Sequence, residues 1–297
     1  MNLCDSHEVK ALLARHGFHF SKTMGQNFLT ADWVPREIAA ACGADAAHGV
    51  LEVGPGVGCL TWELCQKAAA VVSVELDRSL LPVLAETMAD ADNFRLISAD
   101  ILKLDIPAVL EQNFPGLTPL VCANLPYNIT TPALRVLVEA GRFEAITVMV
   151  QKEVAQRIAA PAGSGDYGAF SVYMQYHTEP EILFDVPPDC FLPRPKVTSA
   201  VVRCRTRAVP PVSPACGKDF FFQTVRAAFA LRRKTLRNSL SSVFGGELDR
   251  EQIAAVIDAC GFPPCVRGEA LGMEEFAALA DRLYGEIEGF GNSPFSH

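Results

Sequence analysis

The stretch Val50-Leu51-Glu52-Val53-Gly54-Pro55-Gly56-Val57-Gly58 decides the fold of this chain. Its first four residues form a short, mostly apolar run that predicts a strand, and residues 60–67 after the glycines predict a helix. Glycines let the backbone approach a ligand closely, and a helix N-terminus attracts electron-rich groups. The stretch therefore predicts a nucleotide-type cofactor site; the alternative is a tight turn between strand and helix with no ligand.

The same alternation of strand and helix continues along the chain. Further predicted strands are residues 71–74, 94–97, 119–123, 145–150, 170–176 and 199–203, and further predicted helices are residues 78–88, 132–140 and 152–159. Strands that alternate with helices at this spacing form a parallel, doubly wound α/β sheet, so a Rossmann-like fold is expected.

A glycine or a polar residue follows each of the first four predicted strands. These residues are Gly54, Glu75, Asp100 and Asn124. Ligands of doubly wound sheets bind beyond the carboxyl ends of the strands. We therefore expect the four residues to line one site.

The composition changes after the last predicted strand. Residues 207–217 contain three prolines and no regular pattern, and from residue 220 onward the pattern is helical. The sequence therefore predicts a cofactor-binding catalytic domain at residues 1–209 and a small all-helical domain at residues 210–297.

The polar strand ends indicate which cofactor the loop takes. Glu75 stands 21 residues after Gly54, where a carboxylate accepts hydrogen bonds from both ribose hydroxyls. Asp100 is placed to accept from an adenine amino group, or else it caps a helix that starts at Ile101. No Gly-Lys-Ser/Thr motif for phosphate is present, which favours S-adenosylmethionine over a nucleoside triphosphate.

The tetrapeptide Asn124-Leu125-Pro126-Tyr127 indicates the substrate. The amino group of an adenine is a poor nucleophile because its lone pair is delocalised into the ring. The Asn124 side-chain oxygen and the Leu125 carbonyl can accept its two N–H bonds, and the ring of Tyr127 can stack on the base. The tetrapeptide therefore predicts methyl transfer to a nucleic-acid base; the alternative is a turn with a buried tyrosine.

Composition and charge limit the remaining possibilities. The net charge of −8 counts against a nucleic-acid binder, so RNA contact needs basic residues gathered on one surface. Ten cysteines and six histidines show no metal-ligand spacing, and no metal site is expected. Neither a membrane span nor a signal peptide is recognised, which predicts a cytoplasmic protein.

The motifs, taken in order, resemble the ribosomal RNA small-subunit adenine N6-dimethyltransferase family of the KsgA type. The matching segments include Gly25-Gln26-Asn27-Phe28-Leu29, Glu52-Val53-Gly54-Pro55-Gly56, Glu75-Leu76-Asp77-Arg78, Asp100-Ile101-Leu102, Asn124-Leu125-Pro126-Tyr127-Asn128-Ile129, Phe191-Leu192-Pro193-Arg194-Pro195-Lys196-Val197 and Arg232-Arg233-Lys234-Thr235-Leu236-Arg237-Asn238. The resemblance implies a class I S-adenosylmethionine methyltransferase that dimethylates N6 of two adjacent adenosines near the 3′ end of small-subunit rRNA, on a 30S particle.

The resemblance also implies a set of site residues. Cofactor contacts are implied at Asn27, Leu29, Gly54, Glu75, Asp100 and Asn124. Asn124, Leu125 and Tyr127 hold the target base, with Phe191 as the second ring of the sandwich; the alternative for Phe191 is a core phenylalanine.

RNA contact is expected at two basic groups. Residues 222–244 carry an apolar stripe at helical spacing, with Arg226, Arg233 and Arg237 along one adjoining edge and Arg232 and Lys234 beside them. Arg194 and Lys196 stand close to Phe191. These side chains can contact phosphates, or else they form a solvated surface paired with acids.

Three other functions compete with this interpretation. The first is a large-subunit rRNA adenine N6-methyltransferase of the kind that confers macrolide resistance. Pro55 and residues 232–238 favour the small-subunit enzyme over it. The second is a nicotinamide-dependent oxidoreductase, which would need a glycine where Cys59 stands. The third is a non-catalytic RNA-binding assembly factor. The protein is expected to be a monomer.

Overall fold

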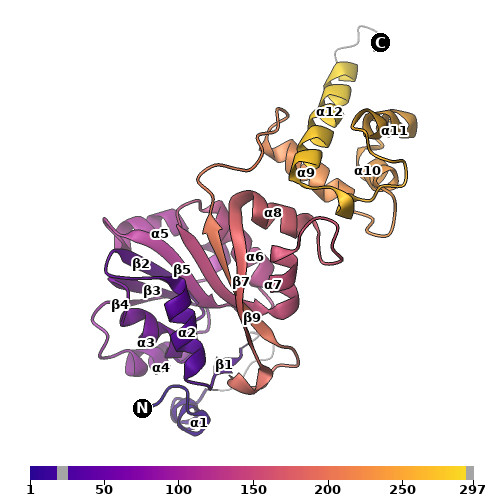
Figure 1. Cartoon of the computed structure of the whole chain (residues 1–297). Helices are drawn as coiled ribbons and strands as arrows, with labels where there is room; N and C mark the ends of the chain where they lie inside the picture. The colour runs from indigo at the N-terminus through magenta and orange to yellow at the C-terminus, as the bar shows by residue number, and fades with distance from the viewer. Residues whose placement is uncertain (19–25, 292–297) are drawn as a thin grey trace. The chain divides into compact units, whose positions relative to one another are not determined.

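The computed structural model describes residues 1–18 and 26–291 of the chain (Figure 1). The chain forms two compact units, Met1–Ala155 with Glu179–Thr206 and Gln156–Thr178 with Arg207–His297. The second unit therefore includes a segment from the middle of the sequence. The division into catalytic and helical domains after residue 209 stays a prediction.

The first unit is built around a seven-stranded sheet. Its strands, in spatial order, are β4 (Phe94–Ser98), β3 (Ala70–Glu75), β2 (His48–Val53), β5 (Thr118–Asn124), β6 (Ala145–Gln151), β9 (Ser199–Thr206) and β7 (Thr178–Val186). The first five strands are parallel, and β9 runs antiparallel to β6. A separate antiparallel pair joins β1 (Phe28–Leu29) to β8 (Phe191–Leu192). The predicted doubly wound, Rossmann-like sheet is confirmed, with a mixed sheet because β9 runs antiparallel to β6.

Helices cover both faces of this sheet, with α2 in front and α5 and α6 behind in Figure 1. The helices up to the end of β6 are α1 (Ser6–Arg15), α2 (Trp33–Cys42), α3 (Cys59–Cys65), α4 (Leu81–Thr87), α5 (Ile106–Asn113) and α6 (Thr130–Glu139). Apolar residues of α2 and α3 pack on strand residues such as Val50 and Val71. On the opposite face the ring of Phe114, the residue after α5, lies directly against Gly49.

The second unit is helical. After α7 (Lys152–Ala159), which passes into it, its helices are α8 (Ala169–His177), α9 (Lys218–Ala228), α10 (Leu236–Phe244), α11 (Arg250–Ala259) and α12 (Met273–Gly291). α9 packs against α8, α10 and α12. Its buried Phe221 shares a core with Phe244 and Phe276.

The strand predicted at residues 170–176 is wrong, because these residues form α8. The β-branched and aromatic residues suggested a strand, but local capping and packing favour a helix. The Ser171 side chain accepts a hydrogen bond from the Gly168 amide, and Gln175 donates to carbonyls at the end of α7. Val172 and Tyr176 then bury their side chains in the helical core.

The continuous helical stripe predicted at residues 222–244 is also wrong. Helix α9 ends at Ala228, and α10 begins at Leu236 with Thr235 as its N-cap. The first amide of α10, that of Leu236, donates to the Val266 carbonyl and not to a carbonyl of α9. Val243, placed on the apolar stripe by the pattern, is exposed. The basic residues therefore do not share the edge of a single helix.

We predict that Gly49→Ala destabilises the protein by about 1–3 kcal/mol, as overpacking of a core does. A Cβ at Gly49 would stand 2.4 Å from ring carbons of Phe114. Thermal unfolding followed by circular dichroism measures the change. Gly165→Ala is the control, since nothing lies within 4 Å of the added Cβ. Equal melting temperatures for the two variants would contradict the packing.

Candidate active site

The glycine loop after β2 takes a backbone shape that only glycine adopts readily. Gly54 and Gly56 both have left-handed φ angles, 68° and 61°. A Cβ at Gly56 would lie 3.0 Å from a ring carbon of Phe28. The loop leads into α3 and lines a cavity with the ends of the neighbouring strands. A side chain at Gly56 would strain this arrangement.

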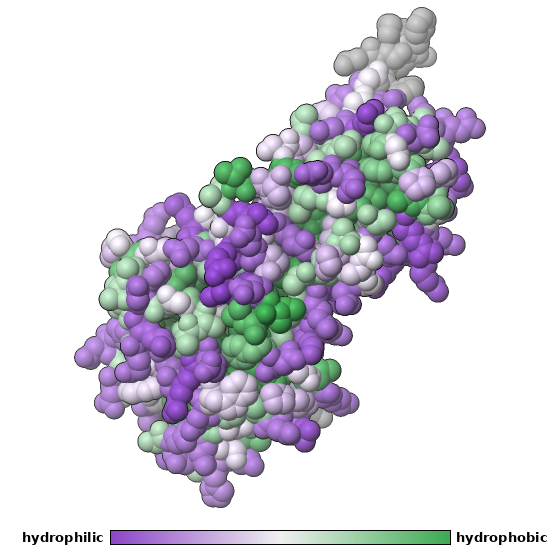
Figure 2. Space-filling model, in the orientation of Figure 1, coloured by the Kyte–Doolittle hydropathy of each residue, from purple (hydrophilic) through white to green (hydrophobic). Residues whose placement is uncertain are grey.

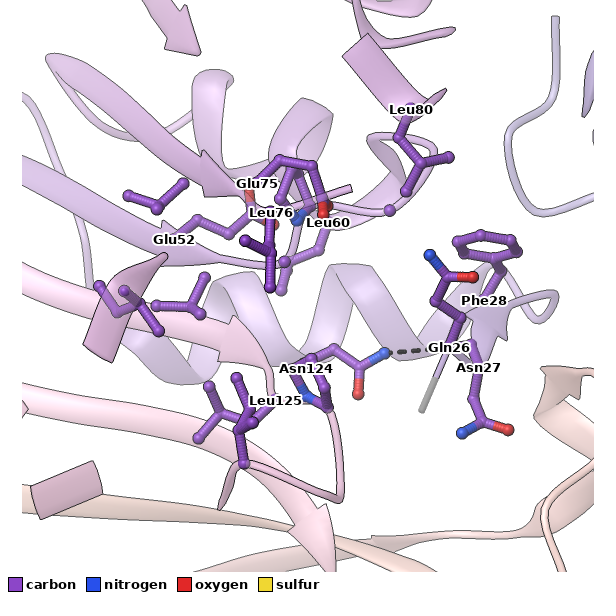
Figure 3. Close-up of a pocket in the computed structure, with 18 of the residues that line it drawn as sticks. Gln26, Asn27, Phe28, Glu52, Leu60, Glu75, Leu76, Leu80, Asn124 and Leu125 are labelled. Carbon is purple, nitrogen blue, oxygen red and sulfur yellow. Dashed lines mark hydrogen bonds between the residues drawn. The ribbon is translucent and has the colours of Figure 1, made fainter. Parts of the chain in front are cut away.

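The cavity brings together the residues that follow the first four parallel strands (Figure 3). Gly54, Glu75, Asp100 and Asn124 all line it. Figure 3 labels two of them, Glu75 and Asn124. Residues 26–29, which include the predicted contacts Asn27 and Leu29, form another part of the wall. The structure therefore places all six predicted cofactor residues around one space, and their roles stay predictions.

Glu75 is a buried carboxylate at the end of β3. Burial raises its pKa to about 7, although the Asp77 amide donates to its Oε1 across 2.7 Å and opposes the shift. Because it lines the cavity, it can accept hydrogen bonds from a ligand there. An adjoining pair of ribose hydroxyls supplies the donors that a carboxylate in this position takes.

Glu52 is a second buried carboxylate in the wall. Its Oε2 accepts from Thr61 on α3 at 2.7 Å and from Ser73 on β3 at 2.6 Å. Burial raises its pKa to about 7 against the effect of these two hydroxyls. The carboxylate thus joins the strand, the helix after the loop and the neighbouring strand. Glu52 was not among the predicted site residues, although a glutamate inside an apolar strand is a signal of a buried charge.

Asp100 has the capping role that was its alternative interpretation. Its Oδ1 accepts from the Leu102 amide at 3.0 Å, at the start of a short 3-10 helix (Ile101–Lys103). The residue also lines the cavity. The cap fixes its carboxylate at the strand end, and its proposed contact with an adenine amino group stays a prediction.

The Asn124 amide is held in one orientation. Its Nδ2 donates to the backbone carbonyl of Asn27 across 3.2 Å, and Figure 3 shows the Oδ1 turned away from that contact. The next residue, Leu125, donates its amide to the Met149 carbonyl at 3.2 Å. Its own carbonyl accepts no hydrogen bond within the part of the chain that the structure describes. Both predicted acceptor oxygens therefore belong to residues of the cavity wall.

Tyr127 and Phe191, the two predicted stacking rings, differ in position. Tyr127 lines the cavity, and its hydroxyl is 2.6 Å from Oγ of the buried Ser199 on β9. Burial raises the pKa of this phenol. Phe191 is buried in the core beside Leu29, its partner in the β1–β8 pair, and is absent from the cavity wall. The core position was its alternative interpretation, and its stacking role stays a prediction.

The predicted RNA-contacting side chains are all exposed. Arg226 lies on α9, Arg237 lies on α10, and Arg232, Arg233 and Lys234 lie in the turn between these helices. Arg232 donates to the Gly165 carbonyl. In the first unit Arg194 pairs with Asp189 at 2.8 Å, and Lys196 is exposed nearby in the sequence.

The wall of the cavity carries acids and no bases. Its ionisable carboxyls are Glu52, Glu75 and Asp100, and none of the described wall residues is lysine, arginine or histidine. Such a wall attracts a cationic ligand and offers no side-chain counter-charge to phosphate. Against a dinucleotide, and hence against the oxidoreductase alternative, stands Cys59 in the place of the third glycine. Among residues 1–18 and 26–291 no cluster of metal-ligating side chains is found.

Comparison with known proteins identifies the fold first. The structure resembles a dimethyladenosine transferase from Plasmodium falciparum, with a TM-score of 0.71 at 21% identity over 84% of this chain and 95% of that one. It also resembles the 23S rRNA methyltransferase ErmE, with a TM-score of 0.65 at 28% identity over 86% of this chain and 99% of that one. The fold is that of a class I, Rossmann-like methyltransferase, as expected.

The sequence comparisons then identify the family. The model for the ribosomal RNA adenine dimethylase family matches residues 17–258, and the chain belongs to this family. Ribosomal RNA small subunit methyltransferase A of Geobacillus thermodenitrificans is 45% identical over 93% of this chain and 94% of its own length. The protein of the same name from Streptococcus pneumoniae strain P1031 is 44% identical over 96% and 99%. The family resemblance drawn from the motifs is confirmed.

The cofactor of this family of enzymes is S-adenosylmethionine, and the cavity fits it. Glu75 offers carboxylate oxygens that can accept hydrogen bonds, the left-handed glycines leave room where side chains would stand, and the acidic wall suits a sulfonium cation. In the part of the chain that the structure covers, no helix is both long and apolar enough for a membrane span.

Two contacts of the site escaped the sequence analysis. Gln26 Nε2 donates to Asp77 Oδ2 at 2.7 Å, and the hydroxyls of Tyr127 and Ser199 meet. Gln26 and Asp77 are 51 residues apart, and Tyr127 and Ser199 are 72 apart. No local pattern links residues at such separations, so only the fold reveals them.

We predict that cofactor affinity rises roughly tenfold between about pH 6 and about pH 8, because the ionised carboxylate of Glu75 is the stronger acceptor. With a pKa of about 7, Glu75 loses its proton across this range. Calorimetry with S-adenosylhomocysteine at several pH values measures the effect. Glu75→Gln should bind weakly with a flat profile. If Glu75→Gln still binds the cofactor more tightly at higher pH, another group such as Glu52 causes the pH dependence, and its assignment to Glu75 fails.

Proposed function

We propose that this protein transfers methyl groups from S-adenosylmethionine to N6 of two adjacent adenosines near the 3′ end of small-subunit rRNA, and that it acts on a 30S particle during ribosome biogenesis. The observation that carries this proposal is the orientation of Asn124. Its amide nitrogen is occupied by the Asn27 carbonyl, so its oxygen remains as an acceptor beside the carbonyl of Leu125.

These two oxygens suit the chemistry of an adenine amine. Each accepts one N–H bond of the amine, which draws the nitrogen lone pair out of conjugation with the ring and aims it along one direction. The ring of Tyr127 offers a stacking surface worth roughly 1–3 kcal/mol per base. Its hydroxyl contact with Ser199 restrains where that ring stands.

S-adenosylmethionine, when bound, supplies a methyl group activated by a sulfonium charge. The chain contributes alignment, and well-oriented reactants can gain roughly 7–11 kcal/mol from it. No strong base is required, because alkylation itself acidifies the amine proton. The neutral amide and carbonyl groups of the wall are consistent with this requirement.

The small subunit is favoured over the large one as substrate. The relatives that share 44–45% identity with nearly the whole chain are named as small subunit methyltransferases, whereas the 23S rRNA methyltransferase shares 28%. The large-subunit alternative therefore rests on the more distant likeness. Asn124, Leu125 and Tyr127 are here called the amine clamp. Because Asn124 and Tyr127 are both present, the clamp supports an enzyme over a non-catalytic assembly factor.

For RNA contact we propose the exposed basic residues of both units. They are Arg194, Lys196, Arg226, Arg232, Arg233, Lys234 and Arg237. Contacts of this kind are salt-sensitive because they release counterions. With a net charge of −8 the protein is suited to a preassembled particle rather than to free RNA. Its monomeric state and cytoplasmic location stay predictions.

Methylation of isolated ribosomal subunits tests the proposal. Small and large subunits from cells without this protein are incubated with the enzyme and labelled S-adenosylmethionine. Label should enter the small-subunit rRNA, as N6,N6-dimethyladenosine. Label confined to the large subunit, or absent from both, would refute the assignment.

We predict that Asn124→Ala lowers the rate of methyl transfer by at least about a hundredfold, comparable to the loss of one preorganised polar group in other active sites. Cofactor binding should weaken only partly, because Glu75 and the glycine loop remain. Single-turnover kinetics on small subunits and calorimetry with S-adenosylhomocysteine measure the two effects.

Asn113→Ala is the control for this variant. Asn113 is a half-buried asparagine on α5 that bonds Arg95 and the Val109 carbonyl, and it is not part of the cavity wall. It should methylate at the wild-type rate. Full activity of Asn124→Ala would remove the basis of the amine clamp.

A further inference from the structure

Residues 26–29, here called the strap, connect opposite sides of the cavity. In the sheet β2 lies between β3 and β5. The strap bonds Asp77, two residues beyond β3, and also Asn124 at the end of β5. The next residue, Phe28, lies against Gly56 in the loop that follows β2. The strap therefore contacts the turn after β3, the end of β5 and the glycine loop after β2.

One end of the strap is tied to the ribose side of the cavity. Gln26 Nε2 donates to Asp77 Oδ2 at 2.7 Å, and the Asp77 amide donates to Glu75 Oε1 at 2.7 Å. The other oxygen of Asp77, Oδ1, accepts from the amide and hydroxyl of Ser79. Asp77 is thus fixed by its own turn, and it links Gln26 to the carboxylate expected to hold the cofactor.

The next residue of the strap is tied to the substrate side. The carbonyl of Asn27 accepts from Asn124 Nδ2 at 3.2 Å, and this contact decides which face of the Asn124 amide is turned toward a base. Gln26 and Asn27 are consecutive residues of the chain, and Figure 3 shows both beside Phe28. A shift of Gln26 would therefore move the carbonyl that orients the clamp.

We propose that Gln26 is a positioning residue whose bond to Asp77 couples cofactor binding to the orientation of the Asn124 clamp. Phe28 and Leu29 are held by their pairing with β8, and the Gln26–Asp77 bond holds the other end of the strap, so that the Asn27 carbonyl sets the Asn124 oxygen for the target amine. This inference rests on the proposed function for the identity of the amine and on the cavity alone for the cofactor.

Gln26→Ala tests the coupling with two separate measurements. The dissociation constant of S-adenosylhomocysteine, measured by calorimetry, should rise about tenfold, the effect of losing a hydrogen bond to a charged group. The single-turnover rate on small subunits at saturating cofactor should fall at least about threefold, because a strap without its bond to Asp77 leaves the Asn124 amide misaligned. The melting temperature without cofactor should fall only slightly, because one partly buried hydrogen bond is lost. Gln112→Ala, an exposed glutamine on α5, should match the wild type in both measurements.

An exchange of donor and acceptor separates positioning from mere packing. Gln26→Glu alone places two carboxylates together and should weaken binding further. Gln26→Glu combined with Asp77→Asn restores a donor opposite an acceptor, and the asparagine oxygen can still accept from Ser79. The double variant should recover most of the affinity and most of the rate.

Each other outcome overturns the inference. Wild-type affinity in Gln26→Ala, or a loss of affinity that the double variant fails to recover, rejects a role of the Gln26–Asp77 bond in cofactor binding. Weakened binding with an unchanged rate at saturation rejects the coupling to Asn124. If the wild-type protein methylates no ribosomal subunit, the proposed function fails. The calorimetric comparison still decides whether the Gln26–Asp77 bond supports cofactor binding.

Discussion

The parallel pairing of β2 with β3 on one side and β5 on the other is the constraint on which the site depends. Parallel strands end at the same edge of a sheet, so the residues after them meet although they are far apart in the chain. Gly54, Glu75 and Asn124 owe their proximity to this pairing. The left-handed glycines then open a space at that edge, and the strap closes part of it.

The charge of the cavity has a physical consequence for ligand choice. Two buried glutamates with pKa values near 7 and one capped aspartate line a space whose described wall has no basic side chain. Burying carboxylates is costly, and here hydroxyl and amide donors offset part of the cost. A cationic ligand offsets more of it than a phosphate could. The acidic interior therefore agrees with the sulfonium cofactor that the family uses.

Local patterns predicted the part of the fold that depends on local physics. The strand and glycine loop at residues 50–58, and the polar residues that end the next three strands, follow from sequence spacing alone. Residues 170–176 were misjudged because Gln175 and Ser171 bond α7 across a loop, which propensity cannot anticipate. The single basic edge at residues 226–237 failed because α9 ends at Ala228 and Thr235 caps a new helix, whose first amide donates to the distant Val266 carbonyl.

The candidate site divides in the same way. Of the residues that the motifs single out, Asn124, Leu125 and Tyr127 line the cavity, whereas Phe191 lies in the core. What orients these groups, namely the Asn27 carbonyl, Asp77 and Ser199, comes from segments that meet only in the folded chain. Sequence thus indicates which groups act, and tertiary structure shows how they are held.

Mass spectrometry of small-subunit rRNA from cells with and without this protein tests the central claim most directly. The account predicts N6,N6-dimethyladenosine at two neighbouring positions near the 3′ end when the protein is present, and unmodified adenosines there when it is absent. Identical modification in both samples would contradict the account.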